Sequence, residues 1–435
     1  MKETRAALSL LIFIISVHVA LLLPQSTQSL DVTAGYAPTT CPGALNDARA
    51  TLLLPTTNQK SKYLSSLRSD FNVNRSGTLP LTKGAVVIAG DARSSLELQS
   101  KAGKWTSATS CYIGAEESWF VGGSAGITSQ SKLVMDNSGL SDATVEVTTF
   151  SENGPGQPVS YTIKAASEKV VRLDALSPGA GKIVTKVKVL SGRVTPFLLD
   201  ERVKGLNNLG GDFVAPQIAP ASTIVIPALP STLGRDSSLQ HVLRIMATGT
   251  LDGTVSVEIV SSNGVIVPVD LGEIALNSQE VVEVPLNDLQ VGQENFGIRI
   301  TATTPIVAGV YVQGKKGALS DFSWHSASTP FESTTFNLYG LEPILTFISE
   351  KISVSAQWRD NRGKSFSKTL KGEEILNWKV PANVRLLTLT SFTGTIAGMT
   401  WSSQDGIATL PVTAGSSLSS ATRPIAEISV IQPRH

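Results

Sequence analysis

From about residue 115 onward, hydrophobic and polar residues alternate in short segments that are separated by turns. In Thr144–Val147, Thr254–Ile259 and Ile352–Trp358, every second residue is apolar, and this period of two predicts half-buried β-strands. A turn rich in Gly or Asn follows each segment, as expected for hairpins. After the N-terminus no stretch follows the 3.6-residue period of an amphipathic helix, and the pattern allows only a short helical turn near Ala44–Leu54. The pattern therefore predicts an all-β protein.

The predicted strands recur at a nearly constant spacing. Thr144–Val147 matches a segment 110 positions later, and Val170–Leu173 matches Val281–Val284 at an offset of 111. In front of these copies, Trp105–Thr109 is similar to Trp324–Ser328, 219 positions further on and about two periods away. Such coincidences at one spacing predict three full repeats and a shorter unit that precedes them.

Each full repeat offers about seven strands with turns between them, the count of an immunoglobulin-like or fibronectin-like antiparallel β-sandwich. We therefore expect tandem sandwich units after an N-terminal hydrophobic helix. No long Ser/Gly-rich linker separates the units, so we expect them to pack as a compact row or arc. The predicted parts are a signal peptide or membrane anchor, a short β unit closed by a disulfide, and three sandwiches, at residues 1–30, 31–112, 113–220, 221–330 and 331–435.

The N-terminus has the pattern of an export segment. Lys2 and Arg5 precede the uncharged run Ala6–Leu23, and Pro24 follows it. This order is typical of a secretory signal, while the length of the run approaches the ~20 residues of a membrane-spanning helix. A cleaved signal and an uncleaved anchor in the cytoplasmic membrane both remain open. Either one places the rest of the chain outside the cytoplasm, secreted or anchored.

The chain has two cysteines, Cys41 and Cys111. In an oxidising compartment an isolated pair predicts one disulfide, here with the two residues 70 positions apart. A reactive thiol is the alternative, and two cysteines without nearby histidines make a poor metal site. We expect no metal site.

The low net charge argues against nucleic acid and anionic membranes as partners. The formal net charge is +1 and 16% of the residues are charged, so no strong field attracts nucleic acid or an anionic membrane surface. Contact with a membrane is expected only through the N-terminal helix.

Candidates for catalysis are few. Outside the export segment the histidines are His241, His325 and His435, and no G-x-S-x-G motif is present. His325 is interpreted as a packing or exposed-loop residue. The adjacent acids, such as Asp200-Glu201, point to opposite faces of a strand and are expected at solvated edges or turns. The turn Gly363–Ser365 lacks the leading Gly of a phosphate-binding loop. We therefore predict no enzyme activity, no catalytic residues and no cofactor.

The tryptophans are the remaining candidates for a binding site. Trp119, Trp324, Trp358, Trp378 and Trp401 could form a sugar-binding surface, but a core role is favoured because an indole often fills the centre of a sandwich.

Several short motifs carry a resemblance. Trp119–Gly123 follows Cys111, and the turn Leu176–Gly179, the pair Asp212-Phe213 and the segment Val225–Pro230 come later. Together they resemble an uncharacterised family of exported actinobacterial envelope proteins, over most of residues 111–330. The resemblance implies an exported protein of this architecture, and the family carries no assigned activity or catalytic residues.

The sequence thus predicts an exported, non-catalytic structural or interaction protein of the cell envelope. Its partner would be another envelope protein or a wall polymer, and the sequence fixes neither that partner nor an oligomeric state. The alternative is a carbohydrate-binding module for wall glycans, which exposed and coplanar aromatic side chains would favour. Less expected is an envelope hydrolase, with clustered acids or His325 in a cleft.

Overall fold

The fold is taken from a computed structural model of the whole chain. It describes residues 14, 31–33, 38–55, 61–66, 70–71, 77–82, 84–88, 95–233, 237–286, 289, 291–316, 319–413 and 420–422. Apart from Ile14, the predicted export segment lies outside the described residues. Within the described ranges, no helix is long and apolar enough to cross a membrane.

The chain is nearly all β, as predicted, and its sheets are antiparallel. The alternating segments at residues 144, 254 and 352 lie in β12 (Ala143–Ser151), β21 (Gly253–Ser261) and β28 (Ile344–Asp360). The helical turn considered near residues 44–54 is wrong, because β3 (Arg49–Leu53) occupies that segment. Beyond Ile14, which is helical, helix in the described residues is limited to α2 (Leu173–Leu176) and two short 3-10 turns.

Residues 36–416 form one compact unit, and its first part consists of two small sheets. Cys41 and Cys111 form a disulfide with their Cα atoms 4.5 Å apart, across 70 residues of sequence. The bond joins β2 to the residue that follows β9. One sheet has the order β2 (Thr39–Cys41), β7 (Val86–Ile88), β4 (Ser61–Tyr63), β5 (Asp70–Phe71), and the other β6 (Thr78–Leu81), β3, β8 (Leu96–Lys101), β9 (Trp105–Ser110).

The next part has two facing sheets, with an apolar core that includes Phe120, Leu133 and Val187. The alternation of β12 explains its place there, since Val145 and Val147 are buried and Glu146 between them is partly exposed. The first sheet contains β10 (Glu117–Val121), β16 (Val184–Ser191), β12, β13 (Gly154–Pro155) and β14 (Val159–Ile163), and the second β15 (Ser167–Arg172), β11 (Lys132–Asn137), β17 (Val194–Lys204) and β18 (Asn207–Val214).

A sheet built around the long strand β25 (Phe296–Lys316) follows. Four other strands pair directly with β25, which therefore holds this part of the chain together. Its partners and the outer strands are β19 (Ala221–Leu229), β20 (Ser237–Ala247), β21, β26 (Leu319–Ser326), β22 (Gly264–Ile266), β23 (Ile274–Leu276) and β24 (Val282–Pro285).

The last large sheet is organised by the hairpin of β28 and β29 (Ser365–Lys379). Its core includes Phe347, Leu387 and Met399. The other strands are β27 (Ser333–Asn337), β30 (Val384–Ser391), β31 (Ile396–Ser402) and β32 (Ile407–Val412). Separately, β1 (Asp31–Thr33) pairs with β33 (Ser420–Thr422) in a second unit of the chain.

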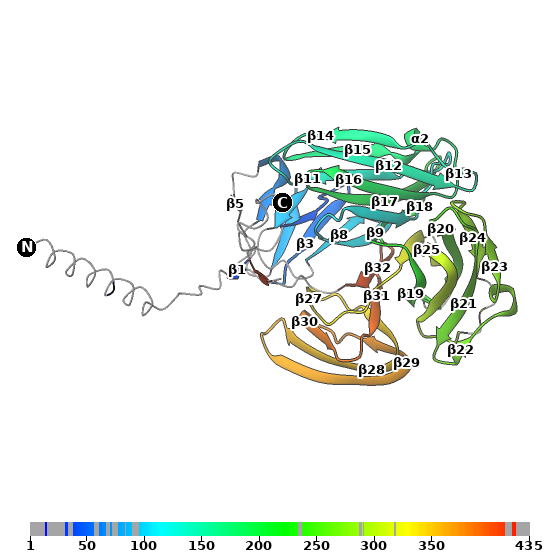
Figure 1. The fold of residues 1–435 in the computed structure, drawn as a ribbon. Helices are drawn as coiled ribbons and strands as arrows, with labels where there is room; N and C mark the ends of the chain where they lie inside the picture. The colour runs from blue at the N-terminus through cyan, green and yellow to red at the C-terminus, as the bar shows by residue number, and fades with distance from the viewer. Residues whose placement is uncertain are drawn as a thin grey trace, which may run out of the picture. The chain divides into compact units, whose positions relative to one another are not determined.

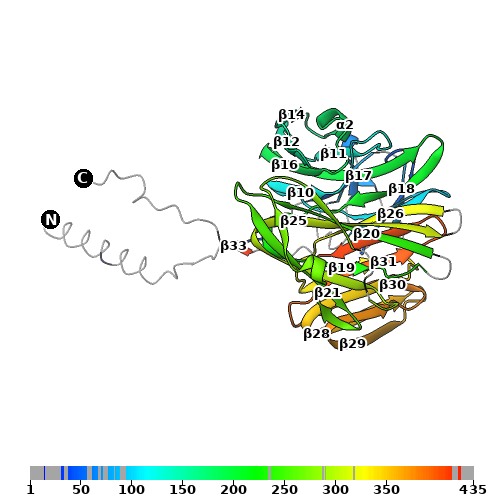
Figure 2. The ribbon, with the colours of Figure 1, turned by 90° about the vertical axis from the view of Figure 1, so that its right-hand side faces the viewer.

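Four strands meet at the centre of the compact unit. β9 contacts β18, β18 contacts β26, β26 contacts β32, and β32 contacts β9 again. Figure 1 labels β9, β18 and β32 of this group, and Figure 2 labels β18 and β26. The expected row or arc is therefore wrong, since the parts close into a ring. Each of the four strands is the second strand of a hairpin, and within its sheet it pairs with the strand that precedes it along the chain. The repeat spacing reveals such units but not the contacts between their edges.

Candidate functional site

The central ring of β9, β18, β26 and β32 contains His325 and two buried carboxylates. Asp212 lies on β18, Asp321 and His325 lie on β26, and all three are buried. The glycines beside them allow this close approach. A Cβ atom at Gly406 would collide with the Asp321 carboxylate, and Gly210, at φ +121°, has no room for one either.

Asp212 joins three strands of the ring. Its carboxylate accepts hydrogen bonds from Ser107 Oγ of β9 at 2.5 Å and from the backbone N–H of Trp324 of β26 at 2.7 Å. Ser107 Oγ in turn accepts the N–H of Phe213 at 2.9 Å. Burial raises the pKa of Asp212 well above its usual range, although these hydrogen bonds favour the charged form.

Asp321 of β26 also joins neighbouring strands of the ring, here β18 and β32. It accepts the N–H of Gly211 at 3.1 Å on one oxygen and the N–H of Ile407 at 2.9 Å on the other. Burial again raises its pKa well above the usual range, against the effect of the backbone hydrogen bonds. Asp212 and Asp321 thus connect neighbouring strands through buried hydrogen bonds, a structural use of carboxylates.

His325 is a packing residue. It is 2% exposed, and its ring nitrogens lie 3.0 Å from Ser323 Oγ and 3.2 Å from Thr409 Oγ1. Burial lowers the pKa of His325 to about 3, with a smaller contribution from the charge of His241. The imidazole is therefore neutral near pH 7. The reading of His325 as a packing residue is confirmed, and the exposed-loop alternative is wrong.

The adjacent acids Asp200 and Glu201 lie in the core, so the expectation of a solvated edge is wrong for this pair. Their side chains do reach different partners. Asp200 accepts the indole N–H of Trp324 at 2.9 Å, and Glu201 accepts the indole N–H of Trp105 at 3.1 Å. The two tryptophans that recur at two repeat lengths thus bond to successive acids of one strand. β17 has a neighbouring strand on each side, and the hydrophobic pattern of the segment itself does not show which strands lie next to it.

Sequence reasoning missed Asp136 of β11. Asp136 is fully buried, and neither carboxylate oxygen has a hydrogen-bond partner within the described residues. Burial raises its pKa well above the usual range, and the charges of Glu168 and Glu97 add to the effect. Glu97 is also buried, which raises its pKa to about 7. The signal in the sequence was the single acid directly after the apolar run Leu133–Met135.

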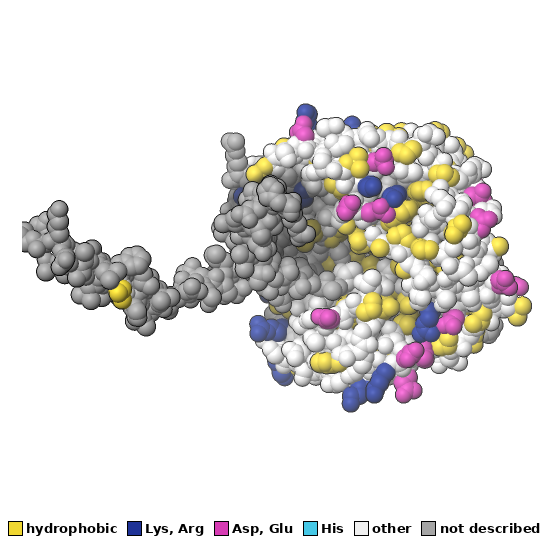
Figure 3. Space-filling view, viewed as in Figure 1, with side chains coloured by type: hydrophobic (Ala, Val, Ile, Leu, Met, Phe, Trp, Pro, Cys, Tyr) yellow, Lys and Arg dark blue, Asp and Glu magenta, His cyan; other side chains and the backbone are white. Residues whose placement is uncertain are grey.

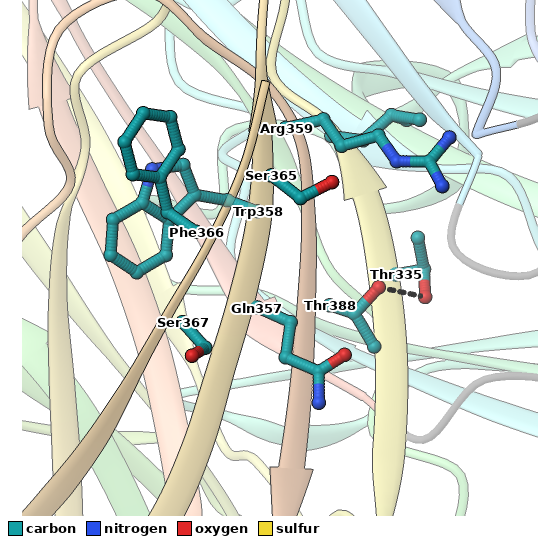
Figure 4. A pocket seen from close by; sticks show the side chains of 9 residues that line it. Thr335, Gln357, Trp358, Arg359, Ser365, Phe366, Ser367 and Thr388 are labelled. Carbon is teal, nitrogen blue, oxygen red and sulfur yellow. Dashed lines mark hydrogen bonds between the residues drawn. The ribbon is translucent and has the colours of Figure 1, made fainter. Parts of the chain in front are cut away.

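Outside the ring, an open hollow lies on the β28–β29 hairpin. It has a volume of about 550 Å³ and is lined from β27, β28, β29 and β30, as Figure 4 shows. Trp358 and Phe366 on its wall are half-buried, with ring centroids 5.6 Å apart and planes 13° apart. The other four tryptophans that the sequence offered as a sugar surface are buried, as the core reading predicted.

Nothing in the described residues resembles a metal centre, since no three His, Cys, Asp or Glu side chains come together in a suitable group. The phosphate-loop lookalike at Gly363 lies in a turn, and so does a second glycine-rich segment that resembles such a loop, Gly179–Lys182. Gly363, at φ +83°, turns the chain between β28 and β29, and Gly179–Lys182 lies between α2 and β16. The polar groups of the ring hold strands together, and the half-buried aromatic pair stands at the surface.

These features define an all-β protein of antiparallel sheets with one disulfide. The chain belongs to the family of unknown function DUF5719, which matches residues 82–366. The match extends further in both directions than the motifs between residues 111 and 330 indicate. Among curated proteins, no sequence matches the chain.

Three solved structures show remote likenesses to this chain. A crystal structure of Thermotoga maritima 1070 is 20% identical over 23% of this chain and 93% of that one, with a TM-score of 0.20. A Streptomyces avermitilis alpha-L-rhamnosidase complexed with L-rhamnose is 7% identical over 83% of this chain and 54% of that one, at a TM-score of 0.14. A tetra-tandem repeat from the extending region of a large adhesion protein is 11% identical over 86% and 93%, at 0.10. At these TM-scores the likenesses carry no argument.

Proposed function

We propose that this chain is an exported, non-catalytic protein of the cell envelope that binds another envelope protein or a wall polymer through its sheet surfaces. The observation that supports it best is the use of the buried polar groups. Asp212, Asp321 and His325 are enclosed where four strands meet, and each is bonded to a neighbouring strand or residue. A catalyst needs such groups within reach of a substrate.

The proposed architecture is a set of tandem immunoglobulin-like or fibronectin-like sandwiches at residues 113–220, 221–330 and 331–435, after the short unit at 31–112. The repeat spacing and the antiparallel sheets support it. Closing these units into one ring leaves the outer sheet faces as the surfaces available to a partner. Repeated domains that pack against their neighbours suit a scaffold or binding role.

Export is supported by two independent features. The apolar run Ala6–Leu23 follows two basic residues, and the Cys41–Cys111 disulfide belongs to an oxidising compartment. The chain is either secreted after cleavage or held at the cytoplasmic membrane by its N-terminal helix. The resemblance to exported actinobacterial envelope proteins points to the same location.

An envelope-binding assay tests the proposal. Purified chain would be mixed with washed, insoluble envelope of the host, centrifuged, and measured in the pellet and supernatant. We expect it to sediment with the envelope in a saturable manner and to release no soluble fragments of the polymer. Steady release of fragments that Asp212→Asn or His325→Gln abolishes, with the fold intact by circular dichroism, would instead establish a hydrolase.

A further inference from the structure

A second hollow adjoins the one in Figure 4 and shares Trp358 and Phe366 with it. It lies where β28 turns into β29 and has a volume of about 470 Å³. Pro381 adds an apolar wall, while Asn361, Arg362 and Asn383 supply polar groups. A concave site that combines apolar walls with a few polar groups is the usual form of a small-ligand site.

The aromatic pair is held in place from behind. The ring of Trp378, which is nearly buried, lies 5.8 Å from that of Trp358 at an interplanar angle of 50°. Trp358 and Phe366 are stacked and half-buried, so part of their surface faces solvent. An aromatic ring with a fixed orientation offers an apolar surface at little entropic cost. The C–H face of a pyranose ring suits such a surface.

The polar side of the hollow is built on a fixed turn. Asp360 accepts the backbone N–H groups of Arg362 and Lys364, each at 2.9 Å, on one carboxylate oxygen. The N–H of Asn361 donates to the carbonyl of Asn383 at 3.1 Å and ties the turn to the neighbouring loop. The backbone is therefore set, while the side chains of Asn361, Arg362 and Asn383 are exposed. Amide and guanidinium groups in such positions suit hydroxyl and carboxylate groups of a ligand.

The charged residues near this hollow favour an acidic ligand. Basic side chains exceed acidic ones around this turn, while Figure 3 shows side chains of both charges on the wider lobe of β28–β30. Asp360, the acid of the group, already accepts two backbone hydrogen bonds. The charged residues between positions 357 and 368 are Arg359, Asp360, Arg362, Lys364 and Lys368.

We propose that this hollow binds an acidic polysaccharide, with a pyranose ring against Trp358 and a carboxylate at Arg362. The inference rests on the proposed function, because it names the chemistry of the wall polymer. It also assigns the carbohydrate-binding alternative to particular residues. The neighbouring hollow, with Gln357, Ser367 and Thr388 on its wall, extends the site for a further sugar unit.

Affinity electrophoresis with purified chain tests the proposal, using polygalacturonate and hyaluronate as acidic probes and dextran as the neutral probe. We expect retardation by at least one acidic polymer and weaker retardation by dextran. Trp358→Ala and Arg362→Gln should each weaken binding by about tenfold or more, the equivalent of one stacking or charged contact. Phe392→Ala is the matched control, because this exposed aromatic belongs to the same sheet region but does not line either hollow.

Trp358 packs against the core, so its variant needs a check of folding by circular dichroism. Arg362 is exposed, and its variant keeps the test decisive if Trp358→Ala fails to fold. Equal binding by wild type and Arg362→Gln, tighter binding to dextran, or no binding to either acidic probe would overturn the proposal. If the wild-type chain still sediments with envelope in that case, the assignment of this hollow fails and the proposed function stands. If the wild-type chain does not sediment with envelope either, the proposed function fails as well.

Discussion

Buried acids are the most demanding residues of this protein, and it accommodates them in two ways. Asp212 and Asp321 accept several hydrogen bonds from neighbouring strands. Asp136 accepts none within the described residues. A buried carboxylate without partners opposes ionisation, and it costs stability when the pH forces the charge.

Asp136→Asn should therefore stabilise the protein as the pH rises. The pKa of Asp136 is raised in the folded state, so the folded chain keeps a proton that the unfolded chain loses above about pH 4. The stability that comes from this proton falls as the pH rises toward the folded pKa. We expect the variant to match wild type at pH 4 and to gain roughly 1–3 kcal/mol at pH 8. Urea unfolding at both values measures this, with exposed Asp142→Asn as the control.

His325 has the opposite pH dependence. Its pKa is lowered to about 3 in the folded protein, against about 6.5 in an unfolded chain. The unfolded state binds the extra proton first, so stability is lost as the pH falls from about 6.5 toward about 3, by about 1 kcal/mol per pH unit. His325→Gln should remove much of this acid sensitivity. Unfolding curves between pH 4 and 7 would contradict the account if both proteins lost stability in parallel.

At the scale of elements, local alternation is enough to predict many strands. The apolar positions 145, 147, 255 and 257 mark the buried faces of β12 and β21 correctly, because a period of two is a property of a single strand. The burial of Asp200 and Glu201 depends on strands that are about a hundred residues away. The sequence shows that Trp105 and Trp324 recur, but it does not predict which acids accept their indole N–H groups.

Arg244 of β20 carries the next prediction, since it links separate sheets. It is 2% exposed, donates to the carbonyls of Gly123 and Ile183 at 2.7 and 2.9 Å, and forms an ion pair with Glu283 at 2.7 Å. Its replacement leaves buried carbonyls without partners. Arg244→Met should cost roughly 2–4 kcal/mol.

Arg299→Met is the matched comparison for Arg244→Met. Arg299 pairs with Glu258 and Glu374 in partly exposed positions, so its loss should cost less than about 1 kcal/mol. Chemical unfolding of both variants measures the difference. Similar losses for the two arginines would contradict the assignment of Arg244 as a buried link between sheets.

At the scale of the whole molecule, ring closure makes each part depend on its neighbours. The sequence predicts the repeats and the cysteine pair, yet it predicts a row or arc where β9 and β32 in fact meet. That contact joins residues about 300 positions apart, and no local period encodes it. The sequence likewise did not predict the hollow at Trp358, because its walls come from the turn after β28 and the loop before β30.

The disulfide should act mainly on the first part of the ring. It spans 70 residues of sequence, and a loop of that size stabilises a folded chain by roughly 4 kcal/mol. In the double variant Cys41→Ser/Cys111→Ser we expect amide protection to fall first in β2, β3 and β8 and to persist in β28 and β30. Hydrogen exchange followed by mass spectrometry resolves these segments, and uniform loss of protection would show that the ring unfolds as one unit instead.

We propose that this chain works outside the cytoplasm as a disulfide-closed binding protein. The most direct test is to fractionate the host into cytoplasm, membrane, wall and medium, and to determine the N-terminus and the thiol content of the recovered protein. The account predicts a chain in the envelope or medium without free thiols, starting near Leu30 or Asp31 if secreted, or with an intact N-terminus if anchored. A cytoplasmic chain with Cys41 and Cys111 both reduced would contradict it.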